Sequence, residues 1–144
     1  MKPTWDAYLQ PPVLQRLDLI GMKYRLGAEP ERHGQADCLT LSRYILRTYG
    51  IGTPQADRSW YRRLRKKDYS IFEEQLKLWG TQTTDISVGT VALCRGIDGL
   101  GLATFIDDYP GWLSFIGTEV VWSRLEALNI ESLYCPGNSK SAKH

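Results

Sequence analysis

The chain has 144 residues with a formal net charge of +2, and 42% of its residues are hydrophobic. These values are typical of one globular domain with a core of its own. No apolar run approaches the roughly 20 residues of a transmembrane helix, which excludes a membrane span of that kind. The N-terminal sequence Met1–Asp6 lacks the apolar core of a signal peptide, so we expect synthesis in a cytosol without export by that route.

The first half of the chain predicts helices separated by turns. The expected segments are an arm over 1–12, a short helix over 13–20, an extended or turning segment over 21–27, a loop over 28–36, and helices over 38–49, 59–67 and 70–79. The helix over 38–49 has the clearest pattern, because apolar residues recur at 38, 41, 45 and 49. Gly50 is suited to end it.

The second half of the chain changes to the pattern of β-strands. The expected strands cover 88–94, 100–106, 112–116, 119–122 and 133–135, and turn residues fill 96–99 and 107–111. Helices followed by an antiparallel sheet predict an α+β fold. We therefore expect one domain over 13–135, preceded by the arm and followed by a polar tail over 136–144.

Cysteine and histidine are sparse in this sequence. Cys38, Cys94 and Cys135 are an odd number without a paired motif, which argues against a disulfide framework. The two histidines, His33 and His144, are too few and too scattered for a metal site. The sequence therefore predicts no metal and no other cofactor.

The segment 34–44 joins a polar loop to the start of the clearest helix. Asp37 suits the N-cap position, because its carboxylate can accept the free backbone N–H groups of the first turn. Cys38 then lies on that first turn, where the positive end of the helix dipole favours a thiolate. Papain-like enzymes keep their nucleophile in such a setting.

Several short motifs together resemble the NlpC-type cell-wall peptidases, above all the versions found in phage tails. They are Gly21-Met22-Lys23-Tyr24-Arg25-Leu26-Gly27, Pro30, Asp37-Cys38 and Gly50-Ile51-Gly52-Thr53-Pro54. The resemblance covers residues 15–135. It implies a papain-like α+β fold, with N-terminal helices packed on a small antiparallel β-sheet. It also implies a cysteine peptidase that acts on peptide bonds of bacterial peptidoglycan.

The resemblance implies a role for each matching residue. Cys38 corresponds to the nucleophile, Tyr24 to a tyrosine that assists the oxyanion site, and Asp37 to the aspartate before the cysteine. Gly101 stands in the place of the histidine base, and Ser114 in the place of the residue that orients it. Loss of a general base removes roughly 10²–10⁴ in rate. We therefore expect a poor peptidase.

Three features have two interpretations each. Cys38 is either a reactive thiol or a buried apolar residue left from an active ancestor, and the missing histidine favours the second. His33 is either a substitute base or a solvated loop residue; we prefer the second, because the family holds its base on the sheet. The basic run over 62–67 is either a solvated helix face, which we prefer, or a binding surface, in the first place for an acidic patch of another protein and otherwise for anionic wall polymers. We do not expect nucleic acid as a partner, because no aromatic-interleaved binding module surrounds this run.

These features lead to three hypotheses of function. The first is a degenerate, non-catalytic domain that is a structural component of a phage tail or baseplate, with Trp5 and Tyr8 packed on a neighbouring chain. Its partners are other tail or baseplate proteins, and the virion carries it to the cell wall without an export signal. The second is an active cysteine endopeptidase that hydrolyses peptidoglycan stem peptides during phage entry, with His33 or an unforeseen group as its base. The third is a non-catalytic module that binds cell-wall peptides.

Overall fold

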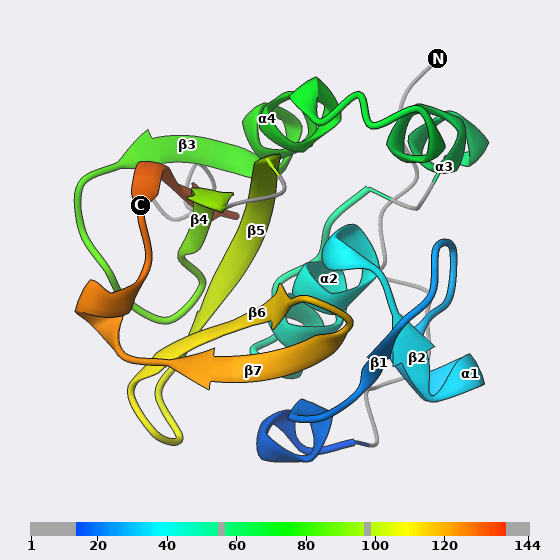
Figure 1. The fold of residues 1–144 in the computed structure, drawn as a ribbon. Coiled ribbons are helices and arrows are strands. Elements are labelled where there is room, and N and C mark those ends of the chain that lie inside the picture. Colours follow the sequence, from blue (N-terminus) through cyan, green and yellow to red (C-terminus); the bar gives the residue numbers. More distant parts are fainter. Residues whose placement is uncertain (1–13, 55–56, 97–98, 138–144) are drawn as a thin grey trace.

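A curled β-sheet forms the framework of the computed structural model, which describes residues 14–54, 57–96 and 99–137 (Figure 1). In the described part of the chain its strand order is β2-β1-β7-β6-β5-β4-β8-β3, and every pair is antiparallel except β1 with β2. The strands are β1 (Lys23–Tyr24), β2 (Gln35–Ala36), β3 (Gly80–Thr83), β4 (Val91–Gly96), β5 (Gly99–Ile106), β6 (Gly111–Ile116), β7 (Glu119–Ser123) and β8 (Ile130–Pro136).

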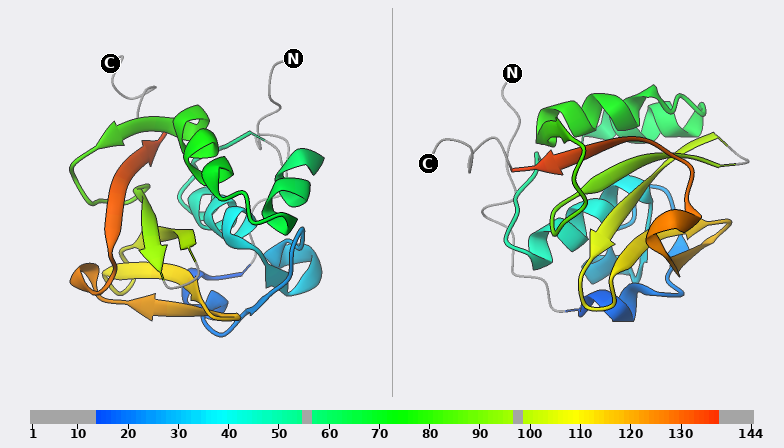
Figure 2. Two further views of the ribbon diagram at one scale, coloured as in Figure 1. Left: turned by 45° about the horizontal axis from the view of Figure 1, so that its top comes forward. Right: turned by 90° about the vertical axis from the view of Figure 1, so that its left-hand side faces the viewer.

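Helices cover one face of this sheet. The α-helices are α1 (Pro30–His33), α2 (Cys38–Thr48), α3 (Arg58–Arg65) and α4 (Ser70–Trp79), and the short 3₁₀ helices are η2 (Arg16–Leu19) and η3 (Leu125–Ala127). Helix α2 packs on β5 and β6, and α4 packs on β3, β4, β5 and β8 with α3 against it (Figure 2). The α+β prediction is confirmed. Within the described ranges, no helix combines the length and apolar character needed to span a membrane.

The start of α2 is fixed by the residues that the sequence indicated. The side chain of Asp37 accepts the backbone N–H of Thr40 at 2.9 Å, and the Asp37 N–H donates to Oγ1 of Thr40 at 2.8 Å. This reciprocal pair is a capping box, and it satisfies two backbone donors at the helix end. The prediction that Cys38 begins a buried helix is confirmed.

The ends of α2 and α3 share one hydrogen-bond pattern, the Schellman motif. After α2, Gly50 has a left-handed φ of +77°, and its N–H donates to the carbonyl of Arg47 at 2.9 Å. After α3, Lys67 has a φ of +61°, and its N–H donates to the carbonyl of Leu64 at 2.9 Å. Glycine is the usual residue at this position, so Gly50 was predictable as a helix end and Lys67 was not.

Alternation along β5 decides which side chains meet α2. Leu102 packs in the same core cluster as Leu39 of α2. Two residues later, Oγ1 of Thr104 lies 2.8 Å from Oγ of Ser42, also on α2. Ala103 and Phe105 belong to a separate cluster with Trp112, on the opposite face of the sheet. The two faces of β5 therefore have different partners, and a shift of one residue exchanges them.

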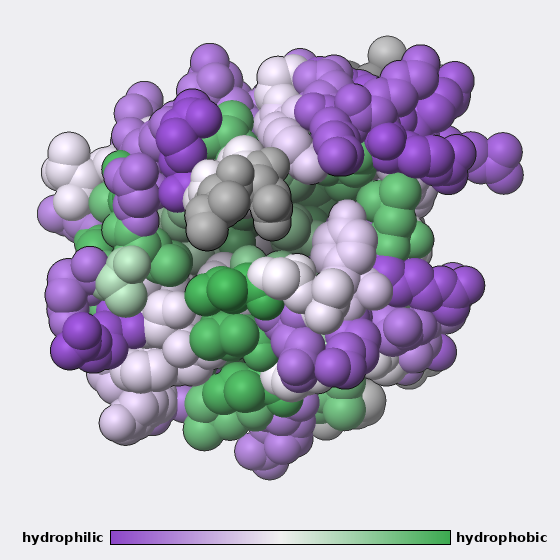
Figure 3. Space-filling view, in the orientation of Figure 1, coloured by the Kyte–Doolittle hydropathy of each residue, from purple (hydrophilic) through white to green (hydrophobic). Residues whose placement is uncertain are grey.

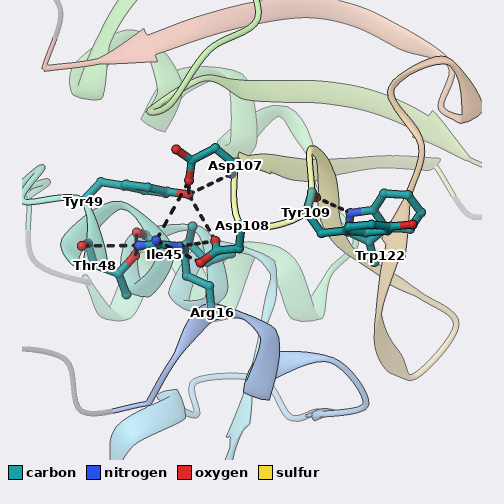
Figure 4. A network of polar contacts seen from close by, with 8 residues as sticks. All are labelled: Arg16, Ile45, Thr48, Tyr49, Asp107, Asp108, Tyr109 and Trp122. Atoms are coloured by element: carbon teal, nitrogen blue, oxygen red, sulfur yellow. Dashed lines mark hydrogen bonds and ion pairs between the residues drawn. The ribbon is translucent and has the colours of Figure 1, made fainter.

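A polar network joins η2 to the end of α2 and to the turn between β5 and β6 (Figure 4). The guanidinium of Arg16 forms two hydrogen bonds with the carboxylate of Asp108, at 2.5 and 3.1 Å, and lies 3.8 Å from the ring centroid of Tyr49. It also donates to Oγ1 of Thr48 at 2.9 Å. The Tyr49 hydroxyl donates in turn to Asp107 at 2.8 Å. The network fastens three segments that are far apart in the sequence.

Several boundaries differ from the sequence predictions. The expected loop 28–36 contains the short helix α1 and the strand β2, and the strands β1 and β3 were not predicted as such. The last strand extends to Pro136, which is buried, and the N–H of Gly137 donates to the carbonyl of Trp79 at 3.0 Å. Both residues, which we had placed in the tail, therefore belong to the domain. The arm 1–12 and residues 138–144 lie outside the described residues.

Candidate functional site

The residues indicated by the cysteine motif meet at the N-terminus of α2. Tyr24 lies on β1, and its backbone pairs with Ala36 on β2, directly before the Asp37–Cys38 step. Burial raises the pKa of the Tyr24 hydroxyl above its usual range, and the proximity of Cys38 and Asp37 raises it further. Its ring also contacts Phe115 edge-on, with the ring centroids 5.2 Å apart. The structure thus brings Tyr24, Asp37 and Cys38 into one site.

Asp37 is a structural residue in this site. It is fully buried, and its second carboxylate oxygen accepts the N–H of Gly27 at 2.8 Å. Burial raises the pKa of the Asp37 carboxyl, while its hydrogen bonds to Thr40, Gly27 and Leu39 oppose that rise. One carboxylate therefore caps α2 and holds the segment after β1 against it. Both carboxylate oxygens of Asp37 are thus engaged in hydrogen bonds with the backbone.

Cys38 has the properties of an unreactive thiol. Desolvation is the largest cause that raises the pKa of Cys38 to about 12, and the charge of Asp37 raises it further. The nearby backbone N–H of Leu102 acts to lower the pKa of Cys38, but its effect is smaller than the rise. The residue as a whole is half-buried. The field of the helix N-terminus, which we expected to favour the thiolate, is outweighed by desolvation and by Asp37.

The neighbour of Cys38 on β5 is Leu102. Leu102 is 3% exposed and belongs to the core cluster against which Cys38 packs. Gly101, which we aligned with the histidine base, pairs with Cys94 on β4, and Cys94 packs on the opposite face with Ala103. A side chain at position 101 would therefore point away from α2. The histidine position assigned to Gly101 thus fails on geometry.

Ser114 lies on the same opposite face. It is directly paired with Ala103 across β5 and β6, and it is buried. Side chains of directly paired residues share one face of a sheet. Ser114 therefore cannot orient a base beside Cys38, and the orienting role implied by the resemblance does not fit its position.

Among the described residues, no hydrogen bond joins His33 to Cys38, so the structure does not support His33 as a substitute base. It ends α1, is exposed, and its Nδ1 accepts the backbone N–H of Glu29 at 2.9 Å. It is the only histidine among the described residues, since His144 lies outside them. In the described ranges, no group of three or more His, Cys, Asp or Glu residues is arranged to hold a metal ion.

Two tyrosines that the sequence analysis did not single out lie close to other residues of the site, Tyr69 near Tyr24 and Tyr61 near Asp37. Tyr61 of α3 and Tyr69 before α4 are partly buried and pack, as Cys38 does, against the core cluster under α3 and α4. The Tyr61 ring lies over Gly27, and its pKa is raised to about 12 by burial and then by Asp37. On this face the surface is hollowed beside the hydrophilic residues of α3 (Figure 3). No local pattern marks these tyrosines, because their proximity to Tyr24 and Asp37 depends on how α3 and α4 pack.

Comparisons of the chain with protein-family models, with curated proteins and with solved structures found no match. The site is therefore interpreted from its own geometry. It has a desolvated thiol, a buried carboxylate used for capping, and phenol hydroxyls. Acyl transfer by a cysteine needs a base within hydrogen-bond reach of the thiol, and Leu102 occupies the facing position.

Proposed function

We propose that this chain is a non-catalytic domain with an NlpC-like arrangement that is a structural component of a phage tail or baseplate. The observation that carries the proposal is that Cys38 faces Leu102. A leucine can neither accept the thiol proton nor return it to a leaving group. The cysteine then fills the space at the start of α2, which is a common use of free cysteine.

The assignment to a phage particle rests on the sequence motifs. The segments 21–27, 37–38 and 50–54 have the spacing of the phage-tail versions of the family. The positions of Tyr24 beside Cys38 and of α2 against β5 support a papain-like arrangement. In this proposal the partners are other tail or baseplate proteins, which Trp5 and Tyr8 would contact from the arm.

A second candidate is a module that binds cell-wall peptides without cleaving them. The observation that favours it is that three partly exposed tyrosines approach the start of α2, with Tyr24 near Cys38, Tyr61 near Asp37 and Tyr69 near Tyr24. Tyrosine rings offer apolar contact together with a hydroxyl, which suits binding of a short peptide. Titration with soluble stem peptides, followed by Tyr24→Ala and Tyr61→Ala, tests this function separately from cleavage.

Complementation tests the structural role. Particles that carry Cys38→Ala should assemble and infect like the wild type, because the thiol has no chemical task. Particles that carry Trp79→Ala, which removes a fully buried side chain, should fail to assemble. Normal assembly of Cys38→Ala particles with loss of infection would instead support the active peptidase.

A further inference from the structure

The outward face of α3 carries a regular row of positive charges. Arg58, Arg62 and Lys66 are exposed and recur at intervals of four residues, and Arg65 is exposed beside them. A helix rises about 1.5 Å per residue, so neighbouring cations in the row are about 6 Å apart along its axis. Figure 3 shows hydrophilic side chains gathered at the upper right, where α3 lies. We name Arg58, Arg62, Arg65 and Lys66 the basic row.

The basic row is held in a fixed orientation. Trp60 and Leu64 on the opposite side of α3 are 3% and 7% exposed and belong to the core cluster. Asp57 caps the helix by accepting the N–H of Ser59 at 2.7 Å. The row therefore faces outward whenever the domain is folded.

Arg63, the neighbour of the basic row, differs from its members because its charge is neutralised by carboxylates. Arg63 forms two hydrogen bonds with the carboxylate of Glu74, at 2.7 and 2.6 Å, and one with Asp68 at 2.8 Å. Among the described residues, no carboxylate forms an ion pair with any member of the basic row. Arg62 is near enough to lower the pKa of Asp57, without an ion pair between them. Within the described part of the chain, the cations of the row therefore face solvent and are open to a partner.

The arrangement costs stability in the isolated domain. Like charges at i and i+4 on a helix repel each other, and Arg58–Arg62 and Arg62–Lys66 are two such pairs. The next residue, Lys67, keeps a left-handed φ of +61° at the helix end, where the equivalent residue after α2 is Gly50. A charged residue in this conformation is a local strain, and strain is retained where something else requires it. A partner of opposite charge would relieve the repulsion.

We propose that the basic row of α3 binds an acidic helix of another protein, with carboxylates at four-residue intervals. Such a helix repeats its charges about every 6 Å, which matches the row. The row spans about 12 Å, enough for only a few phosphates of a nucleic acid, whose affinity depends on many such contacts. Tyr61, the aromatic residue of α3 nearest the row, is half-buried over Gly27 and does not offer its face to a base. The proposal does not depend on the chemistry of Cys38.

The test compares two synthetic peptides of one composition and one DNA duplex. One peptide is an alanine-rich helix with glutamate at every fourth position, and the other has the same glutamates grouped at one end. Fluorescence anisotropy at about 0.05 M salt, where screening is weak, measures binding to the full chain. We expect the spaced peptide to bind more tightly than the grouped peptide and the duplex. The triple variant Arg58→Ser, Arg62→Ser, Lys66→Ser should weaken that binding about tenfold.

A matched control removes three charges elsewhere. Lys77→Ser, Arg95→Ser and Arg124→Ser change exposed residues outside the row and give the same net charge. This control should bind the spaced peptide like the wild type. Equal binding of both peptides, an equal loss in the control, tighter binding of the duplex, or no binding would each overturn the proposal.

Exchanging the charges of the row and of the peptide separates a loss of binding from a loss of folding. The variant Arg58→Glu, Arg62→Glu, Lys66→Glu should lose the glutamate peptide and bind a peptide with lysine at every fourth position. A failure to bind the lysine peptide, in a variant whose circular dichroism is unchanged, would overturn the geometric match of charges. Because Cys38 is intact in all variants, the result is separate from the assays of catalysis.

Discussion

The backbone N–H of Leu102 lies close enough to the Cys38 thiol to lower its pKa, and Cys38 packs against the core cluster that contains Leu102. In a papain-like site the facing strand would supply an imidazole to the cysteine. Here it supplies a backbone donor and an aliphatic side chain. The backbone donor stabilises the thiolate, but the burial of the thiol and the charge of Asp37 oppose it more strongly. The relationship explains how a motif typical of a nucleophile is compatible with a thiol whose pKa is raised.

Cys38 should react slowly with alkylating agents at neutral pH. With a pKa of about 12 in the folded protein against about 8.5 in the unfolded chain, the thiolate fraction at pH 7 is lower by roughly 10³-fold. Peptide mapping by mass spectrometry after iodoacetamide treatment, with and without urea, measures this ratio for Cys38 alone. Equal rates in the folded and unfolded chain would contradict the account of the site.

The same thiol should make stability depend on pH above neutrality. The folded state binds the Cys38 proton more tightly than the unfolded state, because the folded pKa is the higher one. The stability that this difference contributes is fully present below about pH 8.5 and is lost as the pH rises towards about 12. Urea titrations over this range should therefore show a steeper fall for the wild type than for Cys38→Ala. Parallel curves would argue against a raised pKa.

Histidine substitutions on β5 test which residue faces Cys38. In Gly101→His, the new ring lies on the face opposite α2, where an added Cβ would meet no atom within 4 Å. It should leave the Cys38 pKa and the stability nearly unchanged. In Leu102→His, the imidazole replaces a buried leucine in contact with the site, so we expect a lower thiol pKa and a loss of about 2–4 kcal/mol. Alkylation rates against pH and urea titrations of both variants decide the point. A lower thiol pKa in Gly101→His would mean that position 101 faces Cys38 and corresponds to the histidine base after all.

The two Schellman motifs give a matched pair of backbone tests. Gly50→Ala places a Cβ on a residue with φ +77° and should destabilise the domain by about 1 kcal/mol. Lys67→Gly removes a Cβ from the equivalent residue at φ +61° and should stabilise it by up to about 1 kcal/mol. Equilibrium unfolding in urea measures both free energies. A destabilised Lys67→Gly would mean that the lysine side chain supports the fold and that its left-handed conformation is not a net strain.

The contribution of the Arg16–Asp108 pair to the stability of the fold should decrease at acidic pH. The hydrogen bond from Arg16 holds the pKa of the Asp108 carboxyl below its usual range, so this pair stabilises the fold above about pH 4 and is lost as the pH falls further. Because both side chains are partly exposed, Arg16→Met should cost only about 1 kcal/mol at pH 7. The cost should shrink near pH 3. A cost that is the same at both pH values would assign the effect to the stacking on Tyr49.

The sequence predicted features that depend on local chemistry. Asp37 and Gly50 mark the ends of α2 through capping and a left-handed turn, and both act within one turn of the chain. The bounds of α4 were also predicted correctly, because its apolar residues recur at helical spacing and Gly80 follows it. The α+β class followed from the change of period in the middle of the chain.

The features that were missed depend on contacts between distant segments. The face of β5 changes with a shift of one residue, and no local signal near Gly101 distinguishes the two registers. The strands β1 and β2 have two residues each and exist through pairing with one another and with β7. The Arg16–Asp108 contact joins residues that are 92 positions apart. None of these could be derived from neighbouring residues alone.

Cleavage of peptidoglycan fragments by the purified wild type and by Cys38→Ala tests the central claim most directly. With Leu102 beside the thiol and no base in contact with it among the described residues, we predict no turnover by either protein above the uncatalysed rate. The release of new amino termini, followed by mass spectrometry of the fragments, is the measurement. Turnover by the wild type that disappears in Cys38→Ala would contradict the account, and His33→Ala would then identify whether His33 is the base.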